Sequence, residues 1–139
     1  PDPSFTGGRY RFDDLKFSPV CIQQPHVPLW IGGSSEAALR RTALVGDGWH
    51  PASVTPEVFS TAVIRLRELT SEAGRDPNAI ATSVRLDVDT EPDPTGRALA
   101  TVRALIRDYE NAGVQHLVLA LTSGDVPRLR AWMEVLAAS

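Results

Sequence analysis

The sequence predicts an α/β fold built from four successive βα units. From residue 47 onward, short apolar runs alternate with longer helical patterns, and each helical pattern carries its own start and stop signals. The 139 residues are 42% hydrophobic and 22% charged, which is ordinary for a globular domain with a core. Four such units fit either a small open sheet or half of an eight-unit (β/α)8 (TIM) barrel, and the pattern alone leaves both open.

Four apolar segments predict the strands, and the last two are rich in β-branched and aliphatic residues. These segments are Leu29 to Gly32, Gly46 to His50, Ile80 to Val88, and His116 to Leu121. Residues 1–28 differ, because they contain five prolines and the alternation Tyr10-Arg11-Phe12 before Leu15-Lys16-Phe17. This part predicts an extended or hairpin lead-in segment, followed by half-barrel units over residues 29–139.

The first two helices have the clearest boundaries. We expect one from about Ser35 to Val45, capped by Ser34 and ended by a left-handed Gly46. The next has Thr55 as its cap and Pro56 at its first position, and it closes at Gly74. One face of this second helix is apolar, through Val58, Phe59, Ala62, Val63, Leu66 and Leu69.

Two more helices complete the pattern. The third begins at Asp93 or Thr95, around Pro94, and stops at Gly113. Its expected buried positions are Ala98, Leu99, Val102, Leu105, Ile106 and Tyr109. The fourth starts after Gly124-Asp125 and carries an apolar face that includes Trp132 and Met133, which we interpret as core or oligomer interface.

Composition excludes several classes of function. The formal net charge is −3, so the composition does not indicate a basic surface that would bind nucleic acid. No window approaches the roughly 18 apolar residues of a membrane span, and the start Pro-Asp-Pro-Ser has no signal-peptide layout, so we expect a cytoplasmic protein. Cys21 is the only cysteine, which excludes an internal disulfide and multi-thiolate metal sites and leaves a weak nucleophile.

The segment from Trp30 to Ala37 brings together a strand end, the pair Gly32-Gly33, the hydroxyls of Ser34 and Ser35, and a helix start. Glycines let backbone amides approach an anion, and a helix N-terminus offers unpaired N–H groups and partial positive charge. The segment is neither a P-loop nor a G-x-G-x-x-G turn. It therefore fits a phosphate site or a tight strand-to-helix turn with a serine cap.

Longer stretches resemble a known family. Residues 28–41, read as PLWIGGSSEAALRR, and residues 46–49, read as GDGW, resemble the late-barrel signature of the luciferase-like monooxygenases. Phe5-x-Gly7 with Tyr10, Gln23-x-Pro25-x-x-Pro28, and residues 73–77 (AGRDP) resemble the branch assigned to the deazaflavin coenzyme F-420. The resemblance implies a TIM-barrel C-terminal half, βα units five to eight, from a flavin- or deazaflavin-dependent oxidoreductase of monooxygenase or hydride-transfer type.

The resemblance also implies a cofactor site. It assigns phosphate contact, from coenzyme F-420 or FMN, to Gly32, Gly33, Ser34 and Ser35, and it assigns no catalytic residue. The family's first barrel half has no match in these residues. A half barrel exposes two strand edges, so we expect a homo-oligomer or association with the missing N-terminal half. The alternative is a non-catalytic half-barrel remnant that serves as an oligomerisation or interaction module.

Other polar residues have functional and structural interpretations. His50 ends a strand where barrel enzymes carry functional groups, which makes it the best titratable candidate, but the structural interpretation, a strand-end histidine held by backbone before Pro51, is favoured. Arg85, Asp87 and Asp89 share one strand face, which favours an inward structural ion pair over a metal site. Asp47 is expected to brace its turn. We interpret His26 and His116 as incidental, and the strand-end hydroxyls of residues 122–123 as candidates for a second polar contact to cofactor or substrate.

Overall fold

The structure is a computed structural model that describes residues 3–16 and 18–138. Phe17, at the end of the predicted hairpin pattern, lies outside the described residues, as do residues 1–2 and 139. Six strands and four helices are present in the described part. The strands are β1 (Phe5–Thr6), β2 (Arg11–Phe12), β3 (Trp30–Gly32), β4 (Gly48–His50), β5 (Ala81–Asp89) and β6 (His116–Thr122). The helices are α1 (Glu36–Val45), α2 (Pro56–Glu72), α3 (Gly96–Asn111) and α4 (Val126–Ala137).

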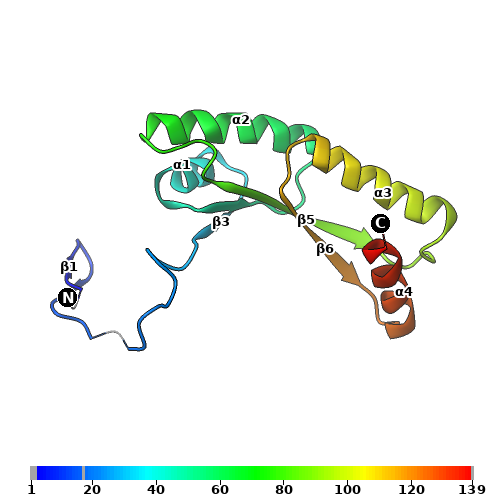
Figure 1. Ribbon diagram of the computed structural model, residues 1–139, viewed down its shortest axis with the longest axis horizontal. Coiled ribbons are helices and arrows are strands. Elements are labelled where there is room, and N and C mark those ends of the chain that lie inside the picture. Colours follow the sequence, from blue (N-terminus) through cyan, green and yellow to red (C-terminus); the bar gives the residue numbers. More distant parts are fainter. Residues whose placement is uncertain (1–2, 17, 139) are drawn as a thin grey trace.

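Strands β3, β4, β5 and β6 form one parallel sheet, in that order. Helices α1, α2 and α3 lie along one side of this sheet, and α4 lies beside the end of β6 (Figure 1). Sequential parallel order with helices on one side is the arrangement of half a (β/α)8 barrel. The predicted fold class is therefore confirmed. None of the helices in the described ranges is long and apolar enough to cross a bilayer.

The core lies between the sheet and helices α1 and α2. Trp49 on β4 is fully buried and stacks on Phe59 of α2, with ring centroids 5.1 Å apart. Around this pair lie apolar side chains from both helices and the strand floor, chiefly Leu39, Ala43, Val63, Leu66, Leu69, Ile80 and Val84. Burying such side chains contributes roughly 1.5–3 kcal/mol each. The predicted apolar face of α2 is thus largely the core face, although Val58 is exposed.

Two predictions about α1 were wrong in detail. The N-cap is Ser35 rather than Ser34, and the Ser35 hydroxyl accepts a hydrogen bond from the Ala38 N–H at 3.3 Å. Gly46 is extended, with φ of −83°, rather than left-handed. A Cβ at Gly46 would lie 2.9 Å from the Thr42 carbonyl oxygen, so this glycine is required by close packing against the end of α1.

Helix α3 also differs from expectation. Of its predicted buried positions only Tyr109 is buried, at 4% exposed, and the others are half-buried. A hollow of about 470 Å³ separates the helix from β5, with Leu86, Val88 and Leu105 among its lining residues. The sheet ends one strand later, at β6, so this part of the molecule is packed from fewer sides than α2.

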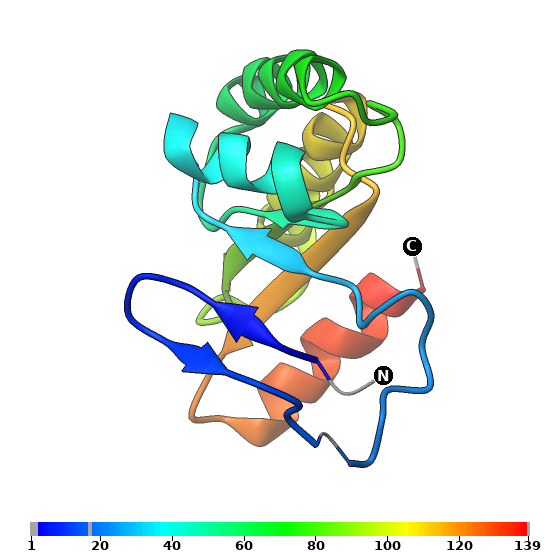
Figure 2. The ribbon, with the colours of Figure 1, turned by 90° about the vertical axis from the view of Figure 1, so that its left-hand side faces the viewer.

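The lead-in segment stands apart from the half barrel. Its strands β1 and β2 form a short antiparallel hairpin in which the rings of Phe5 and Phe12 lie 5.9 Å apart. The hairpin and the extended chain after it project away from the sheet (Figures 1 and 2). Ile22 is 97% exposed, and Cys21 is partly exposed. This segment therefore presents apolar side chains that the described chain does not cover.

Candidate functional site

The predicted phosphate loop is the turn between β3 and α1. Gly33 has φ of +93°, a conformation that side-chain-bearing residues rarely adopt, and a Cβ there would lie 3.3 Å from the Ala38 Cβ. A Cβ at Gly32 would make only an ordinary contact, 3.7 Å from the His50 carbonyl oxygen. Of the two glycines in this turn, Gly33 is therefore the one whose backbone conformation requires glycine.

Two hydrogen bonds fix the loop. The indole Nε1 of Trp49 donates to the Gly33 carbonyl oxygen at 2.8 Å, which ties the turn to the buried core. Ser35 caps α1 through its hydroxyl oxygen. The other N–H groups of a first helical turn have no partner within the helix, so the turn presents amide donors at the carboxyl end of the sheet. Ser34 is exposed beside them.

Acidic Glu36 stands in the same first turn, where its charge would oppose a bound anion. Its carboxylate is paired with Arg40 at 2.7 Å and with Arg65 of α2 at 3.0 Å. The hydrogen bond from Arg65 is the main cause of a lowered pKa at Glu36, with further contributions from the charges of both arginines. Arg40 and Arg65 therefore partly offset this carboxylate, although Arg65 also pairs with Glu68 and Glu72.

Arg75 holds the opposite end of α1. Its guanidinium donates to three main-chain carbonyl oxygens, those of Thr42 at 3.2 Å, Ala43 at 2.8 Å and Gly46 at 2.8 Å. These are carbonyls at a helix C-terminus, where a cation is favoured. Sequence reasoning did not single out this role, although Arg75 lies in the AGRDP stretch. The position of α1, and with it the loop, is fixed at both ends.

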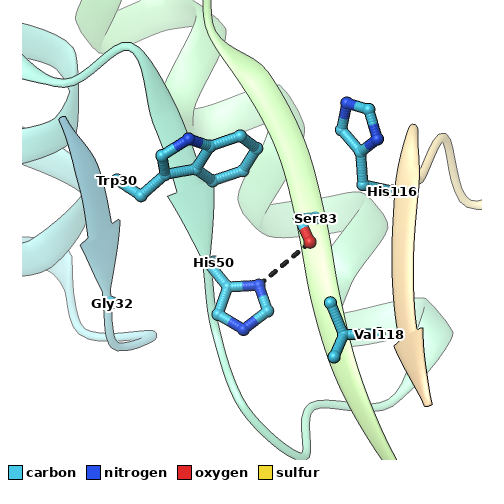
Figure 3. A pocket seen from close by; sticks show the side chains of 6 residues that line it. All are labelled: Trp30, Gly32, His50, Ser83, His116 and Val118. Atoms are coloured by element: carbon cyan, nitrogen blue, oxygen red, sulfur yellow. Dashed lines mark hydrogen bonds between the residues drawn. The ribbon is translucent and has the colours of Figure 1, made fainter. Parts of the chain in front are cut away.

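A hollow of about 420 Å³ lies on the inner face of the sheet, opposite the helices. It is lined by residues from all four strands, Trp30, Gly32, His50, Ser83, His116 and Val118 (Figure 3). Strand register places Gly32 beside His50 and Ser83 beside His116, so one row of the sheet crosses the hollow. Gly32 belongs both to this hollow and to the predicted phosphate loop.

The histidines in this region have specific partners. His50 Nδ1 lies 2.9 Å from the Ser83 hydroxyl oxygen, so a side chain holds it rather than the expected backbone group. The His116 ring meets the edge of Trp30 at 6.0 Å. Sequence reasoning did not identify this contact, because a strand's first residue gives no sign of which residue lies three strands away. Asp47 braces the turn as predicted, accepting from the Leu29 N–H at 2.8 Å.

The carboxyl side of β5 carries the predicted ion pair. The Arg85 guanidinium is 2.8 Å from the Asp87 carboxylate, and both side chains are about half exposed. Asp87 also accepts from the Ser53 hydroxyl at 3.2 Å. Asp89 makes no third ligand with them, and within residues 3–16 and 18–138 no group of three His, Cys, Asp or Glu side chains is arranged to hold a metal ion. The pair is a structural contact on the inner face.

The parallel strands β3 to β6, with the helices on one side and a glycine turn between β3 and α1, define half of a (β/α)8 barrel. Residues 2–138 match the family described as luciferase-like monooxygenase, and the chain belongs to that family. An uncharacterised protein of Mycobacterium tuberculosis is 34% identical over 71 residues, which cover 51% of this chain and 24% of that protein. An uncharacterised protein of Mycobacterium bovis matches to the same extent.

Solved structures show the same fold at low sequence identity. An F-420-dependent secondary alcohol dehydrogenase, in complex with an adduct of F-420 and acetone, has a TM-score of 0.75 at 18% identity, covering 99% of this chain and 56% of that one. A coenzyme F-420-dependent tetrahydromethanopterin reductase from Methanopyrus kandleri has 0.67 at 13%, covering 95% and 55%. Riboflavin lyase, with modified FMN and riboflavin, has 0.71 at 11%, covering 98% and 48%. This chain spans about half the length of these structures.

Proposed function

We propose that this chain is the phosphate-binding half of a flavin- or deazaflavin-dependent oxidoreductase, with Gly32, Gly33, Ser34 and Ser35 contacting the phosphate of FMN or coenzyme F-420. One observation carries the proposal. The β3–α1 turn combines a left-handed Gly33, a carbonyl fixed by Trp49, and a helix N-terminus capped by Ser35. Such a turn directs backbone N–H donors at an anion without side-chain obstruction.

Ion pairing of the one acidic side chain in the first turn reduces its repulsion of a phosphate. Glu36, the acidic residue of the first turn, is paired with Arg40 and Arg65. Ser35 Oγ accepts from the Ala38 N–H, and its own hydroxyl proton remains available to donate to a phosphate oxygen. A bound flavin or deazaflavin supplies hydride chemistry at its ring, and the protein's part is to bind and orient that ring and to exclude water. The family membership and the cofactor-dependent structural neighbours support this assignment.

The complete oxidoreductase requires four more βα units. Strands β3 and β6 end the described sheet on either side, each with one unpaired edge, and the inner face of the sheet is open. The matched structures are about twice as long as this chain. We propose that the remaining units pair with both edges and cover the inner face, and that they supply the substrate-side groups of the reaction.

The phosphate assignment is tested by comparing FMN with riboflavin, which lacks the phosphate. Equilibrium dialysis against the purified chain is expected to give a lower Kd for FMN. Gly33→Asp places a carboxylate in the turn and is expected to remove this preference while leaving the riboflavin Kd unchanged. An equal Kd for the two flavins, or an FMN preference that survives Gly33→Asp, contradicts the assignment. Gly74→Asp is the matched control, since Gly74 also has positive φ, +72°, and lies at the far end of α2.

A further inference from the structure

A small polar pocket lies at the amino-terminal ends of β5 and β6, at the opposite end of the sheet from the β3–α1 turn. Its volume is about 80 Å³. One water molecule occupies roughly 30 Å³ of the liquid, so this space admits a few waters or one small polyatomic ion. The pocket is therefore too small for a flavin and is separate from both the β3–α1 turn and the inner-face hollow.

Three side chains that carry N–H donors line this pocket, and each comes from a different segment of the chain. Arg67 lies on α2, Asn78 lies in the loop between α2 and β5, and Gln115 immediately precedes β6. The apolar part of the lining includes Leu66 and Ile80, which are both buried. Donors brought together from three segments suit a ligand that offers several acceptor oxygens.

The orientation of the Gln115 amide is fixed by its neighbour Thr82. The Thr82 N–H donates to Gln115 Oε1 at 2.8 Å, and because a backbone N–H can only donate, the atom that faces it must be the amide oxygen. The Thr82 hydroxyl is occupied by the Gly113 carbonyl oxygen at 3.0 Å. The Nε2 group of Gln115 is thus directed away from Thr82, and within residues 3–16 and 18–138 it donates to no other group.

The charge around the pocket is positive. Arg67 makes no ion pair with any of the described residues, whereas Arg65 on the same helix is paired with three carboxylates. No Asp or Glu side chain in the described part of the chain lines the pocket. Asp76 is close in sequence, but its carboxylate accepts the Asn78 N–H at 2.9 Å. An unpaired guanidinium beside two neutral amides favours an anion.

We propose that this pocket binds a small tetrahedral oxyanion of the phosphate or sulfate type, held by the Arg67 guanidinium and by the side-chain amides of Asn78 and Gln115. The bound anion joins α2 to the two turns that precede β5 and β6. Because the unfolded chain does not bring these three segments together, the anion binds the folded chain and stabilises it. This site uses no residue of the β3–α1 turn, so it is independent of the proposed cofactor.

Inorganic phosphate is the probe, and thermal unfolding at constant ionic strength is the measurement. We expect Tm to rise to a plateau, with an increase of about 3–6 °C at ten times the Kd. The plateau distinguishes binding from the general salt effect of phosphate, which continues to increase with concentration. Equilibrium dialysis with radiolabelled phosphate gives the Kd directly. Acetate is expected to raise Tm less, because a planar carboxylate offers only two oxygens to the three donors.

Two substitutions remove the donors with little change of shape. Gln115→Glu keeps an oxygen for the Thr82 N–H and replaces Nε2 by a negatively charged oxygen, and Arg67→Gln removes the cation at an exposed position. Each is expected to raise the phosphate Kd about ten- to a hundredfold. Arg41→Gln, at an exposed position on α1, is the matched charge control and is expected to leave the Kd unchanged. Circular dichroism confirms that each variant is folded.

Gly33→Asp distinguishes this pocket from the β3–α1 turn. The plateau in Tm is expected to persist in Gly33→Asp and to disappear in Arg67→Gln, whatever the comparison of FMN with riboflavin shows. The proposal is overturned if Tm rises without a plateau, if acetate raises it as much as phosphate, or if the plateau survives in folded Arg67→Gln. Loss of the plateau in Gly33→Asp alone also overturns it, because the phosphate would then be bound at the β3–α1 turn, in support of the proposed function.

Discussion

Trp49 donates its indole N–H to the carbonyl oxygen of Gly33 at 2.8 Å, and this hydrogen bond connects the fully buried core to the turn between β3 and α1. The indole also stacks on Phe59, so one side chain serves packing and loop geometry together. The connection crosses from β4 to the residue just after β3. This hydrogen bond makes the shape of the turn depend on the packing of the core. Replacing Trp49 by phenylalanine removes the hydrogen bond and keeps an aromatic ring at this position.

Trp49→Phe is expected to lower the free energy of unfolding by roughly 1–3 kcal/mol, through the lost hydrogen bond and the smaller ring. It should also weaken FMN more than riboflavin, because the Gly33 carbonyl is no longer fixed. Urea unfolding and equilibrium dialysis measure the two effects. Trp132→Phe is the matched control, since that buried indole donates to the Pro92 carbonyl at 2.9 Å, away from the turn. Equal losses of FMN preference in both variants would contradict the connection.

Alanine substitutions distinguish the two glycines of the turn. Gly33→Ala is expected to cost about 1–2 kcal/mol of stability, because φ of +93° is unfavourable for an L side chain. Gly32→Ala is expected to be nearly neutral for stability, since its Cβ would meet the His50 carbonyl at an ordinary 3.7 Å. Thermal unfolding of both variants provides the comparison. A larger loss for Gly32→Ala than for Gly33→Ala would contradict this explanation of the turn.

Much of this architecture was predictable from sequence because the signals are local. Thr55 before Pro56 predicted the start of α2, and the Thr55 hydroxyl does accept from the Val58 N–H. The apolar segment before Gly33 predicted a strand, which the structure confirms as β3. The alternation around Arg85 predicted an inward ion pair with Asp87, and that pair is present. Each of these signals acts within a few residues of chain.

The features that the sequence did not predict depend on three-dimensional contacts. Gly46 after a helix suggests a left-handed residue, but the requirement is close contact with Thr42. Gly48 lies in β4, and its lack of a side chain makes room for Trp30 from the adjacent strand. The partners of His50 and His116 lie on strands that follow or precede by about 30 residues or more. No periodicity within one segment identifies such contacts.

Arg75→Met tests the anchor at the C-terminal end of α1. The substitution removes three charge-assisted hydrogen bonds, and only the Thr42 carbonyl keeps a second donor, the Gly46 N–H, so a loss of roughly 2–4 kcal/mol is expected. Arg41→Met, an exposed position on α1, is expected to change stability by less than about 0.5 kcal/mol. Urea unfolding of both variants decides the matter. Similar values for the two would show that the guanidinium contacts do not stabilise the helix end.

Tyr109 links α3 to the loop before α2, because its hydroxyl donates to the Val54 carbonyl oxygen. Burial, and then the charge of Glu57, raise the pKa of Tyr109 above its ordinary value. The folded chain therefore holds this proton more tightly than the unfolded chain. The corresponding stability is fully present below a pH of about 10 and is lost as pH rises through the raised pKa. Tyr109→Phe removes the hydroxyl, so it should cost about 1–2 kcal/mol at neutral pH and flatten this alkaline decline. Urea unfolding at pH 7 and at successive alkaline values measures both effects. A decline as steep in Tyr109→Phe as in the parent chain would assign the alkaline loss to other groups.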